Sequence, residues 1–394
     1  LTPVIKWDSV NNKYVWAISP IALTYTLSDK TTTYDGTTQT LSSFYTSNPF
    51  TIPTGYEFLN LTSADYKFQV DGADVTGYKD AGTYSNIKVA LNGTSATDKF
   101  LTISSSGNTD GKLTINKKDL TISAITANNK TYDGTTTATL SNSGTLVGLV
   151  TGEDLVLNNP TSVIFSSKDV ADSITVTASG YTIADKDSFK ASNYNLLDTS
   201  KTTTANISKA SLTATLNDNS KTYDGTSYSG GNGITFNGFV NGETASLLGG
   251  NLVYSGTSQG AKDAGNYIIS GSGLTSNNYN ISFVDGKLTI NKKDLTISAI
   301  TANNKTYDGT TTATLSNSGT LVGLVTGEDL VLNNPTSVIF SSKDVADSIT
   351  VTASGYTIAD KDSFKASNYN LLDTSKTTTA NIVASVNPTP NPTP

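Results

Sequence analysis

An internal duplication constrains this chain more than any other feature of its sequence. Residues 110–207 and 285–382 have the same sequence. A shorter Tyr-Asp-Gly motif occurs four times, at intervals of roughly 80–100 residues, and each interval is the length of one small domain. The copies are Tyr34-Asp35-Gly36, Tyr132-Asp133-Gly134, Tyr223-Asp224-Gly225 and Tyr307-Asp308-Gly309. The sequence therefore predicts four tandem modules, of which the second and fourth are one domain used twice.

The phase of these motifs sets the predicted domain limits. They are an N-terminal hairpin or tail of a preceding domain (1–19), module 1 (20–117), module 2 (118–208), module 3 (209–292), module 4 (293–383) and a Pro/Thr linker (384–394). Module 1 is divergent and longer than the others. Alternate prolines in the last segment are typical of an extended linker, and we expect more protein to follow it in the parent chain.

Side-chain patterns within the modules predict strands. Residues 111–116 and 172–178 alternate apolar with polar side chains, which is the period of a half-buried strand, and no window has a sustained helical stripe. Thr, Val, Ile and Tyr are frequent, and Asn-Gly and Asp-Gly pairs mark turns between the runs. The predicted fold class is all-β: four tandem small antiparallel β-domains, sandwich-like or with β-grasp character.

The joints between modules predict stiffness. Apolar residues lie at Leu113 and Ile115 before the first joint and at Leu120 and Ile122 after it, so odd inward positions become even ones. A strand of one module should therefore pass directly into a strand of the next. Because no Gly/Ser or Pro-rich hinge separates the modules, we expect an elongated, monomeric rod.

Three further features recur in phase with Tyr-Asp-Gly. They are Lys-Asp-Ala-Gly or Lys-Asp-Val-Ala starting at Lys79, Lys168, Lys262 and Lys343, Asn-Tyr-Asn centred on Tyr194, Tyr279 and Tyr369, and the chain's four Glu residues, Glu57, Glu153, Glu243 and Glu328. We interpret Tyr-Asp-Gly as a turn in which Asp caps the backbone, Gly has positive φ and Tyr packs on its module. The alternative is a sugar or calcium contact. We interpret the phased Glu residues as polar turn residues.

The composition argues against most catalytic chemistry. The chain has no His, Cys, Met or Arg, so it cannot form a Ser-His-Asp or Cys-His arrangement or a His-based metal site. We therefore predict no enzyme activity, no catalytic residue, no metal ligand and no cofactor. Calcium at Asp71 and Asp74 or at Asp185 and Asp187, and an isopeptide bond between Lys and Asn or Asp, stay open as alternatives.

The charge and hydropathy of the chain limit its partners. A net charge of -7 without Arg argues against nucleic acid, and the lack of an apolar run long enough to span a bilayer argues against membrane insertion. The joint absence of the oxidisable residues Cys and Met fits a protein that works outside the cell.

Together, the phased motifs resemble the tandem YDG and MBG repeat domains of large bacterial surface adhesins, including the filamentous-haemagglutinin-like ones. The resemblance covers residues 21–382, with modules 2 and 4 of YDG type and module 3 of MBG type. Module 1 departs from it by an insertion at residues 55–78 and by lacking the closing Asn-Tyr-Asn.

The resemblance implies a passive stalk on the bacterial cell surface. Such a stalk would hold an adhesive tip away from the cell, for attachment or biofilm formation, and its partner would be the rest of a larger adhesin chain. The alternative is a ligand-binding module that contacts a host glycan or protein, through module 1 and the nearby Trp7 and Trp16.

Overall fold

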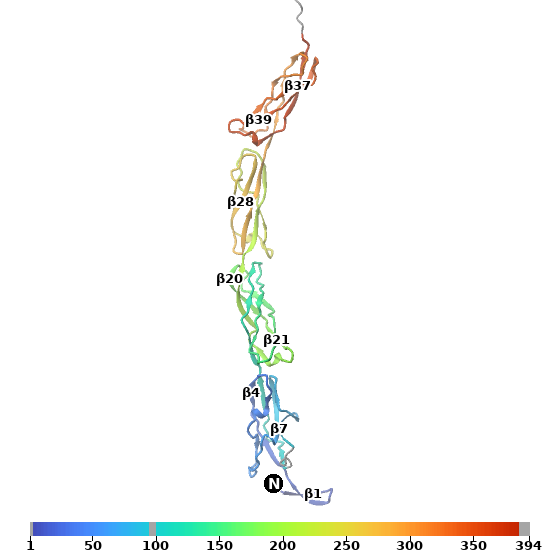
Figure 1. Ribbon diagram of the computed structural model, residues 1–394, viewed down its shortest axis with the longest axis vertical. Coiled ribbons are helices and arrows are strands. Elements are labelled where there is room, and N and C mark those ends of the chain that lie inside the picture. Colours follow the sequence, from blue (N-terminus) through green and yellow to red (C-terminus); the bar gives the residue numbers. More distant parts are fainter. Residues whose placement is uncertain (1–2, 94–99, 386–394) are drawn as a thin grey trace, which may run out of the picture. The chain divides into compact units, whose positions relative to one another are not determined.

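The structure, a computed structural model, describes residues 3–93 and 100–385 of the chain. It forms two compact units, one of Leu1–Thr131 and Thr135–Ser208 and one of Tyr132–Gly134 and Lys209–Pro394. The first unit holds the N-terminal hairpin and most of modules 1 and 2, and the second holds modules 3 and 4. Strands make up nearly all of the regular structure (Figure 1).

The first unit begins with the predicted hairpin, β1 (Pro3–Asp8) and β2 (Lys13–Ile18), which pair antiparallel. Module 1 contains β3 (Ile21–Tyr25), β4 (Lys30–Thr33), β5 (Gln39–Thr40), α1 (Leu41–Phe44), β6 (Phe50–Thr51), β7 (Tyr66–Val70), β8 (Ala73–Asp74), β9 (Gly77–Tyr78), β10 (Gly82–Leu91), β11 (Leu101–Ile103) and β12 (Gly111–Asn116). Module 2 contains β13 (Lys118–Ile122), β14 (Thr126–Ala127), β15 (Lys130–Thr131), β16 (Leu140–Asn142), β17 (Leu146–Val147), β18 (Val156–Asn158), β19 (Ser162–Phe165), β20 (Ala171–Ser179), β21 (Thr182–Ala184), η1 (Ala191–Asn193), β22 (Tyr194–Leu196) and β23 (Ser200–Ser208).

The second unit repeats this organisation. Module 3 contains β24 (Ala210–Leu216), β25 (Asn219–Thr222), β26 (Ile234–Asn237), η2 (Ala245–Leu247), β27 (Gly249–Ser255), β28 (Gly265–Thr275), β29 (Tyr279–Val284) and β30 (Gly286–Asn291). Module 4 contains β31 (Lys293–Ile297), β32 (Thr301–Ala302), β33 (Lys305–Thr306), β34 (Leu315–Asn317), β35 (Leu321–Val322), β36 (Val331–Asn333), β37 (Ser337–Phe340), β38 (Ala346–Ser354), β39 (Thr357–Ala359), η3 (Ala366–Asn368), β40 (Tyr369–Leu371) and β41 (Ser375–Val383).

All four modules contain the same two sheets. In the first sheet the opening strand (β3, β13, β24 or β31) lies between one antiparallel and one parallel neighbour. In the second sheet the closing strand (β12, β23, β30 or β41) pairs antiparallel with a long strand and parallel with the strand just before Tyr-Asp-Gly. The all-β, antiparallel-rich prediction is confirmed. The parallel pairs are additional, because side chains alternate with the same period in both kinds of pair.

The backbone at the joints matches the predicted change of parity. β12 ends at Asn116 and β13 begins at Lys118, and Leu113, Ile115 and Leu120 of these strands are all buried. Only one residue lies between the last strand of module 1 and the first strand of module 2. The same holds in the second unit, where β30 ends at Asn291 and β31 begins at Lys293.

Each of these joints also carries apolar packing. In the first unit, one buried cluster contains Leu113 of module 1 together with Leu120 and Leu155 of module 2. In the second unit, one cluster contains Leu288 of module 3 together with Leu295 of module 4. A hydrophobic core therefore continues across the joint inside each unit, and it places the polar motifs described next.

Candidate functional site: the joint between modules

The Tyr-Asp-Gly motif of module 1 forms a turn at the end of that module. Gly36 has φ +81°, a conformation that glycine adopts without steric cost. The Asp35 carboxylate accepts hydrogen bonds from the Thr37 backbone N–H at 2.9 Å and from the Thr37 hydroxyl at 2.7 Å. The turn directly follows β4, and it presents the side chain of Tyr34 to module 2.

Tyr34 is one of two tyrosines that share a single carboxylate. Its hydroxyl donates a hydrogen bond to Oε1 of Glu153 at 2.7 Å, and the hydroxyl of Tyr194 donates to Oε2 at 2.6 Å. Both tyrosines are buried, with 3% and 2% of their surface exposed, and their rings meet edge to face with centroids 5.5 Å apart. We call this arrangement the Tyr-Glu-Tyr clamp. Because Tyr34 belongs to module 1 and the other two residues to module 2, the clamp ties the modules together.

A tight turn in module 2 places the carboxylate. The backbone N–H of Glu153 donates to the carbonyl of Val150 at 3.0 Å, and the N–H of Val150 donates to the Tyr194 hydroxyl at 3.2 Å. The loop comes so close to Gly36 that a Cβ there would lie 2.8 Å from Cγ1 of Val150. Gly36 therefore serves both the turn and the close approach of the two modules.

The environment of the clamp keeps both hydroxyls protonated. Burial, and then the hydrogen bond to Glu153, raises the pKa of Tyr34 above its ordinary value and raises the pKa of Tyr194 to about 12. Both groups are therefore donors at neutral pH. Hydrogen bonds to a carboxylate are shorter and stronger than those between neutral groups.

Beside the clamp, the Lys-Asp-Ala-Gly motif of module 1 meets the Asn-Tyr-Asn motif of module 2. The side chain of Asn193 is 2% exposed, and its Oδ1 accepts from the backbone N–H of Ala81 at 2.8 Å. Its Nδ2 donates to Oδ1 of Asp80 at 3.0 Å, while Lys190 pairs with Oδ2 of Asp80 at 2.6 Å. These donors, first Lys190 and then Asn193, hold the pKa of Asp80 below its usual range.

The joint between modules 3 and 4 has the same geometry. The hydroxyls of Tyr223 and Tyr369 donate to Glu328 at 2.7 and 2.6 Å. Asn368 accepts from the N–H of Ala264 at 2.7 Å and donates to Asp263 at 2.9 Å, and Lys365 pairs with the same Asp263 at 2.6 Å. The two joints thus use one set of contacts, although the residues before the duplicated stretch, in modules 1 and 3, differ in sequence.

A third clamp lies within the second unit. Tyr132, which belongs to that unit, donates to Oε1 of Glu243 at 2.6 Å, and Tyr279 donates to Oε2 of the same carboxylate at 2.6 Å. The two rings meet edge to face with centroids 5.5 Å apart.

The four predicted Tyr-Asp-Gly motifs differ in their surroundings. Tyr34, Tyr132 and Tyr223 are 3%, 2% and 3% exposed, whereas Tyr307 is 41% exposed. The glycines share one backbone conformation, with φ of +81°, +77°, +75° and +77° at Gly36, Gly134, Gly225 and Gly309. Like Asp35, Asp224 and Asp308 accept hydrogen bonds from the threonine two residues later. In each clamp, the tyrosine of Tyr-Asp-Gly donates a hydrogen bond to a Glu residue outside its own module.

The interpretation of the phased Glu residues as polar turn residues accounts for their backbone but not for the side chains of Glu153, Glu243 and Glu328. Each of these side chains accepts two tyrosine hydroxyls in a clamp. Their recurrence in phase with the two tyrosine motifs is the signal in the sequence for this. Glu57 is different, since it is exposed and accepts from the backbone N–H of Gly55 at 2.8 Å. Module 1 also has Leu101 where module 2 has Tyr194 in the parallel strand pair.

The other candidate sites take part in local contacts. Asp185 accepts from the N–H of Ala191 at 2.7 Å, and Asp74 pairs with Lys67 at 2.8 Å. Over residues 3–93 and 100–385, the structure contains no group of three or more carboxylates that could hold a metal ion. Within the same residues, no helix has the length and apolar character needed to cross a membrane.

Comparison with known proteins places most of the chain in repeat-domain families. The YDG domain model matches residues 116–205 and 291–380, and the MBG domain (YGX type) model matches residues 212–289. A search of curated protein sequences gives no match.

Solved structures give only distant similarities. Drosophila N-cadherin EC1-4 is 10% identical over 92% of this chain and 100% of its own, with a TM-score of 0.21. The protocadherin GammaB4 extracellular domain is 8% identical over 97% of this chain and 72% of its own, with a TM-score of 0.23. TM-scores this low do not establish a shared fold.

Proposed function

The chain belongs, over residues 116–380, to the YDG and MBG (YGX type) repeat-domain families, and we propose that it is a structural spacer, the stalk segment of an exported bacterial surface adhesin. In this proposal the chain works outside the cell and holds an adhesive tip away from the bacterial surface, for attachment or biofilm formation. Its partner is the rest of the adhesin chain, and it carries out no catalysis.

The observation that carries the proposal is the repeated clamp. At both joints inside the units, a half-buried carboxylate accepts hydrogen bonds from two buried tyrosines of different modules, and the apolar core continues across the joint. Hydrogen bonds to charged groups each contribute on the order of 1.5–3 kcal/mol to stability. A joint held this way resists bending, which is the property that a spacer needs and that a flexible linker lacks.

Two features of the sequence fit this role. A stretch the length of a whole module, copied without change, extends the array but adds no new surface chemistry. The absence of Cys and Met removes the side chains most sensitive to oxidation outside the cell.

Small-angle scattering tests the stiffness. Four modules should give a maximum dimension of roughly 120–160 Å, from strand lengths at about 3.3 Å per residue. A compact globule of the same chain length would have a radius of gyration of about 21 Å. We expect the double variant Glu153→Ala and Glu328→Ala to shorten the average particle, and the exposed Glu57→Ala to leave it unchanged. A compact particle, or equal curves for all three proteins, would contradict the spacer.

A deletion tests the role in adhesion. Removal of residues 208–382 joins Ile207 to Val383, and the residues before the cut are the same as those before Val383 in the intact chain. The intact adhesin should lose attachment in proportion to the lost length, while Asp308→Ala should lower only the stability of module 4, by about 0.5–2 kcal/mol. Full attachment after the deletion would count against a role in length.

One observation favours ligand binding as a second candidate function. The hairpin of β1 and β2 exposes three aromatic side chains, Trp7 at 51%, Tyr14 at 72% and Trp16 at 70%, and the first two rings lie 4.8 Å apart. Exposed aromatic rings are a common means of binding sugars and proteins. A glycan array with the chain and with Trp7→Ala and Trp16→Ala would separate the two functions, because a spacer predicts no signal in any of these proteins.

A further inference from the structure

Module 4 carries an uncovered copy of a joint face. Because modules 2 and 4 have the same sequence from Tyr-Asp-Gly to their closing strand, Tyr132 and Tyr307 are the same residue in two settings. Tyr132 is 2% exposed and donates to Glu243, whereas Tyr307 is 41% exposed. The difference between these two tyrosines therefore comes from what lies against them.

The glycines of the same motif show the same contrast. A Cβ on Gly134 would lie 2.8 Å from Cβ of Asn241, and one on Gly225 would lie 3.0 Å from Cγ1 of Val325. A Cβ on Gly309 would meet no atom within 4 Å. In the loop of the Lys-Asp-Val-Ala motif, Val345 is 50% exposed. We call the surface of Tyr307, Gly309 and Val345 the end face.

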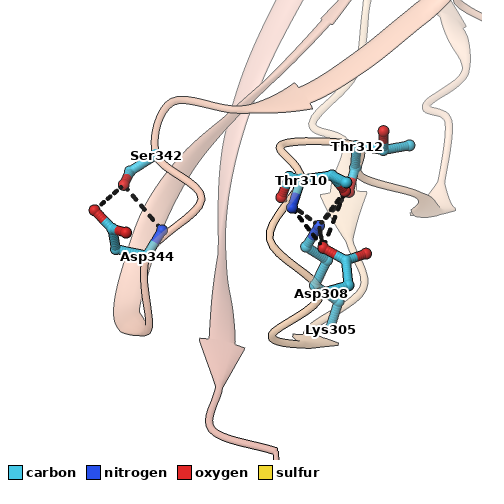
Figure 2. A network of polar contacts seen from close by, with 6 residues as sticks. All are labelled: Lys305, Asp308, Thr310, Thr312, Ser342 and Asp344. Carbon is cyan, nitrogen blue, oxygen red and sulfur yellow. Dashed lines mark hydrogen bonds and ion pairs between the residues drawn. The ribbon is translucent and has the colours of Figure 1, made fainter.

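The end face is already in the conformation that the covered turns have. Lys305 donates to Oδ1 of Asp308 at 2.8 Å and to the carbonyls of Thr310 and Thr312 at 2.7 and 3.0 Å. Oδ1 of Asp308 accepts from the N–H of Thr310 at 2.9 Å, which is also the contact made by Asp35 in a covered turn. Figure 2 shows this network in one loop. A preorganised face binds without the cost of ordering it first.

A second network fixes the neighbouring loop, which carries the Lys-Asp-Val-Ala motif. The N–H of Asp344 donates to Oγ of Ser342 at 3.1 Å, and this hydroxyl donates back to Oδ2 of Asp344 at 3.2 Å (Figure 2). In the covered joints the equivalent Asp80 and Asp263 accept hydrogen bonds from an asparagine of the next module. Asp344 is exposed and offers the same acceptor.

We propose that the end face of module 4 binds the end of an MBG-type module that lies outside this chain. The required end has a Gly-Glu turn and an Asn-Tyr pair, as module 3 has at Glu243 and Tyr279, because that end contacts the identical tyrosine Tyr132. A second copy of this chain does not fit. Its module 3 end is engaged by Tyr132, and its module 1 has Leu101 in place of the required tyrosine.

The binding is expected to need a tether. One tyrosine, one glycine turn and one valine form a small surface, well below the roughly 1,000 Å² of a stable free complex. A flexible tether of about a dozen residues gives an effective concentration in the millimolar range, which compensates for a small interface. The proposal concerns one surface and does not depend on the spacer function, since a spacer could equally end with an uncovered face.

The test uses nitration of tyrosine in extended forms of the full chain. Tetranitromethane also reacts with thiols, of which this chain has none. A Val331→Ile marker, at a position 41% exposed, gives the tryptic peptide with Tyr307 a mass different from that of the otherwise identical peptide with Tyr132. In the marked chain without an extension, Tyr307 should react faster than Tyr132. Equal rates would overturn the proposal at this first step.

Two extended chains then present the partner. In the tethered chain, a flexible Gly/Ser linker of about a dozen residues replaces residues 384–394, and residues 209–382 follow it. In the direct chain, residues 208–382 are added after Ile382, which recreates the junction at residues 207–208 and serves as the positive control. We expect nitration of marked Tyr307 to slow about tenfold in the tethered chain, equivalent to an end face occupied about nine-tenths of the time. Glu243→Ala in the added copy alone should restore the fast rate, and Glu243→Gln should restore it in part.

Three results from the extended chains would also overturn the proposal. Protection of Tyr307 in the direct chain alone would show that the face is covered only when the strands are joined covalently. Protection that survives Glu243→Ala would show nonspecific shielding by the added protein. Fast nitration in both extended chains would show that the end face binds no such module.

Discussion

Replacing Glu153 by Ala should uncouple module 1 from module 2. The change removes the acceptor of two hydroxyls, on Tyr34 and Tyr194, that are only 3% and 2% exposed. A buried donor left without an acceptor costs about 1–3 kcal/mol. Since the N–H of Val150 still contacts the Tyr194 hydroxyl and water can enter the space left by the carboxylate, we expect a total loss of about 2–4 kcal/mol. Glu153→Gln keeps one acceptor and should cost about half as much.

The assay is native-state hydrogen exchange in urea, measured on peptides of modules 1 and 3. Residues 20–109 of module 1 and 209–284 of module 3 lie outside the duplicated stretch, whereas peptides of modules 2 and 4 cannot be told apart. Glu153→Ala should lower the free energy of unfolding of module 1 and leave module 3 unchanged. Glu328→Ala, the identical change at the other joint, should do the reverse. Each variant is thus the control for the other.

Two further measurements decide whether the clamp is the cause. Glu57→Ala removes an exposed carboxylate of module 1 that has no role in a clamp, and should change the free energy of unfolding by less than about 0.5 kcal/mol. A double-mutant cycle of Tyr34→Phe with Glu153→Gln should give a coupling energy of about 1 kcal/mol. The reasoning fails if Glu57→Ala and Glu153→Ala have equal effects, or if the coupling energy is zero.

Unfolding of the whole chain in urea checks three other expectations. Between pH 10 and 12, Tyr194 should lower the free energy of unfolding by roughly 2–3 kcal/mol. Its pKa of about 12 in the fold exceeds the ordinary value near 10, so the unfolded chain loses the proton first. Below pH 10 this stabilisation is fully present, and a free energy of unfolding that does not change with pH would contradict the expectation. Gly36→Ala should cost more than Gly309→Ala, since both have positive φ but only the first places a Cβ 2.8 Å from another module; equal costs would remove the close approach as a cause. Asn193→Ala should lower the free energy of unfolding by about 1–3 kcal/mol, and the exposed Asn195→Ala by less than about 1 kcal/mol. An equal or larger loss for Asn195→Ala would show that the contact of Asn193 across the joint is unimportant.

Local patterns of the sequence determined the strands and the joints. Alternation of apolar and polar side chains reports burial on one face, and so it predicts β12 and β13 and the change of parity between Ile115 and Leu120. The hairpin at β1 and β2 follows from turn residues for the same reason. None of these features needs knowledge of a distant partner.

The repeats also show which residues matter, but not what they do. Tyr-Asp-Gly, Lys-Asp-Ala-Gly, Asn-Tyr-Asn and the single Glu of each module are all visible as phased motifs. The sequence alone favours no more than a turn role for the Glu residues, because a Gly-Glu pair has no local signal for a tyrosine partner. Glu57 of module 1 recurs in phase with the other Glu residues, but its side chain accepts from the backbone N–H of Gly55 and not from tyrosine hydroxyls. The phase of the Glu residues alone therefore does not identify the clamp.

Only the tertiary structure decided that the motifs meet. Tyr34 and Glu153 are 119 residues apart, and Asn193 and Ala81 are 112 residues apart. Partners at such separations are set by strand pairing and by the core that crosses the joint, whereas side-chain periodicity is the same whichever strands pair. The exposure of Tyr307 has the same origin. The sequence around Tyr307 is the same as that around the buried Tyr132, so the exposure of the two side chains differs because of the protein that lies against them.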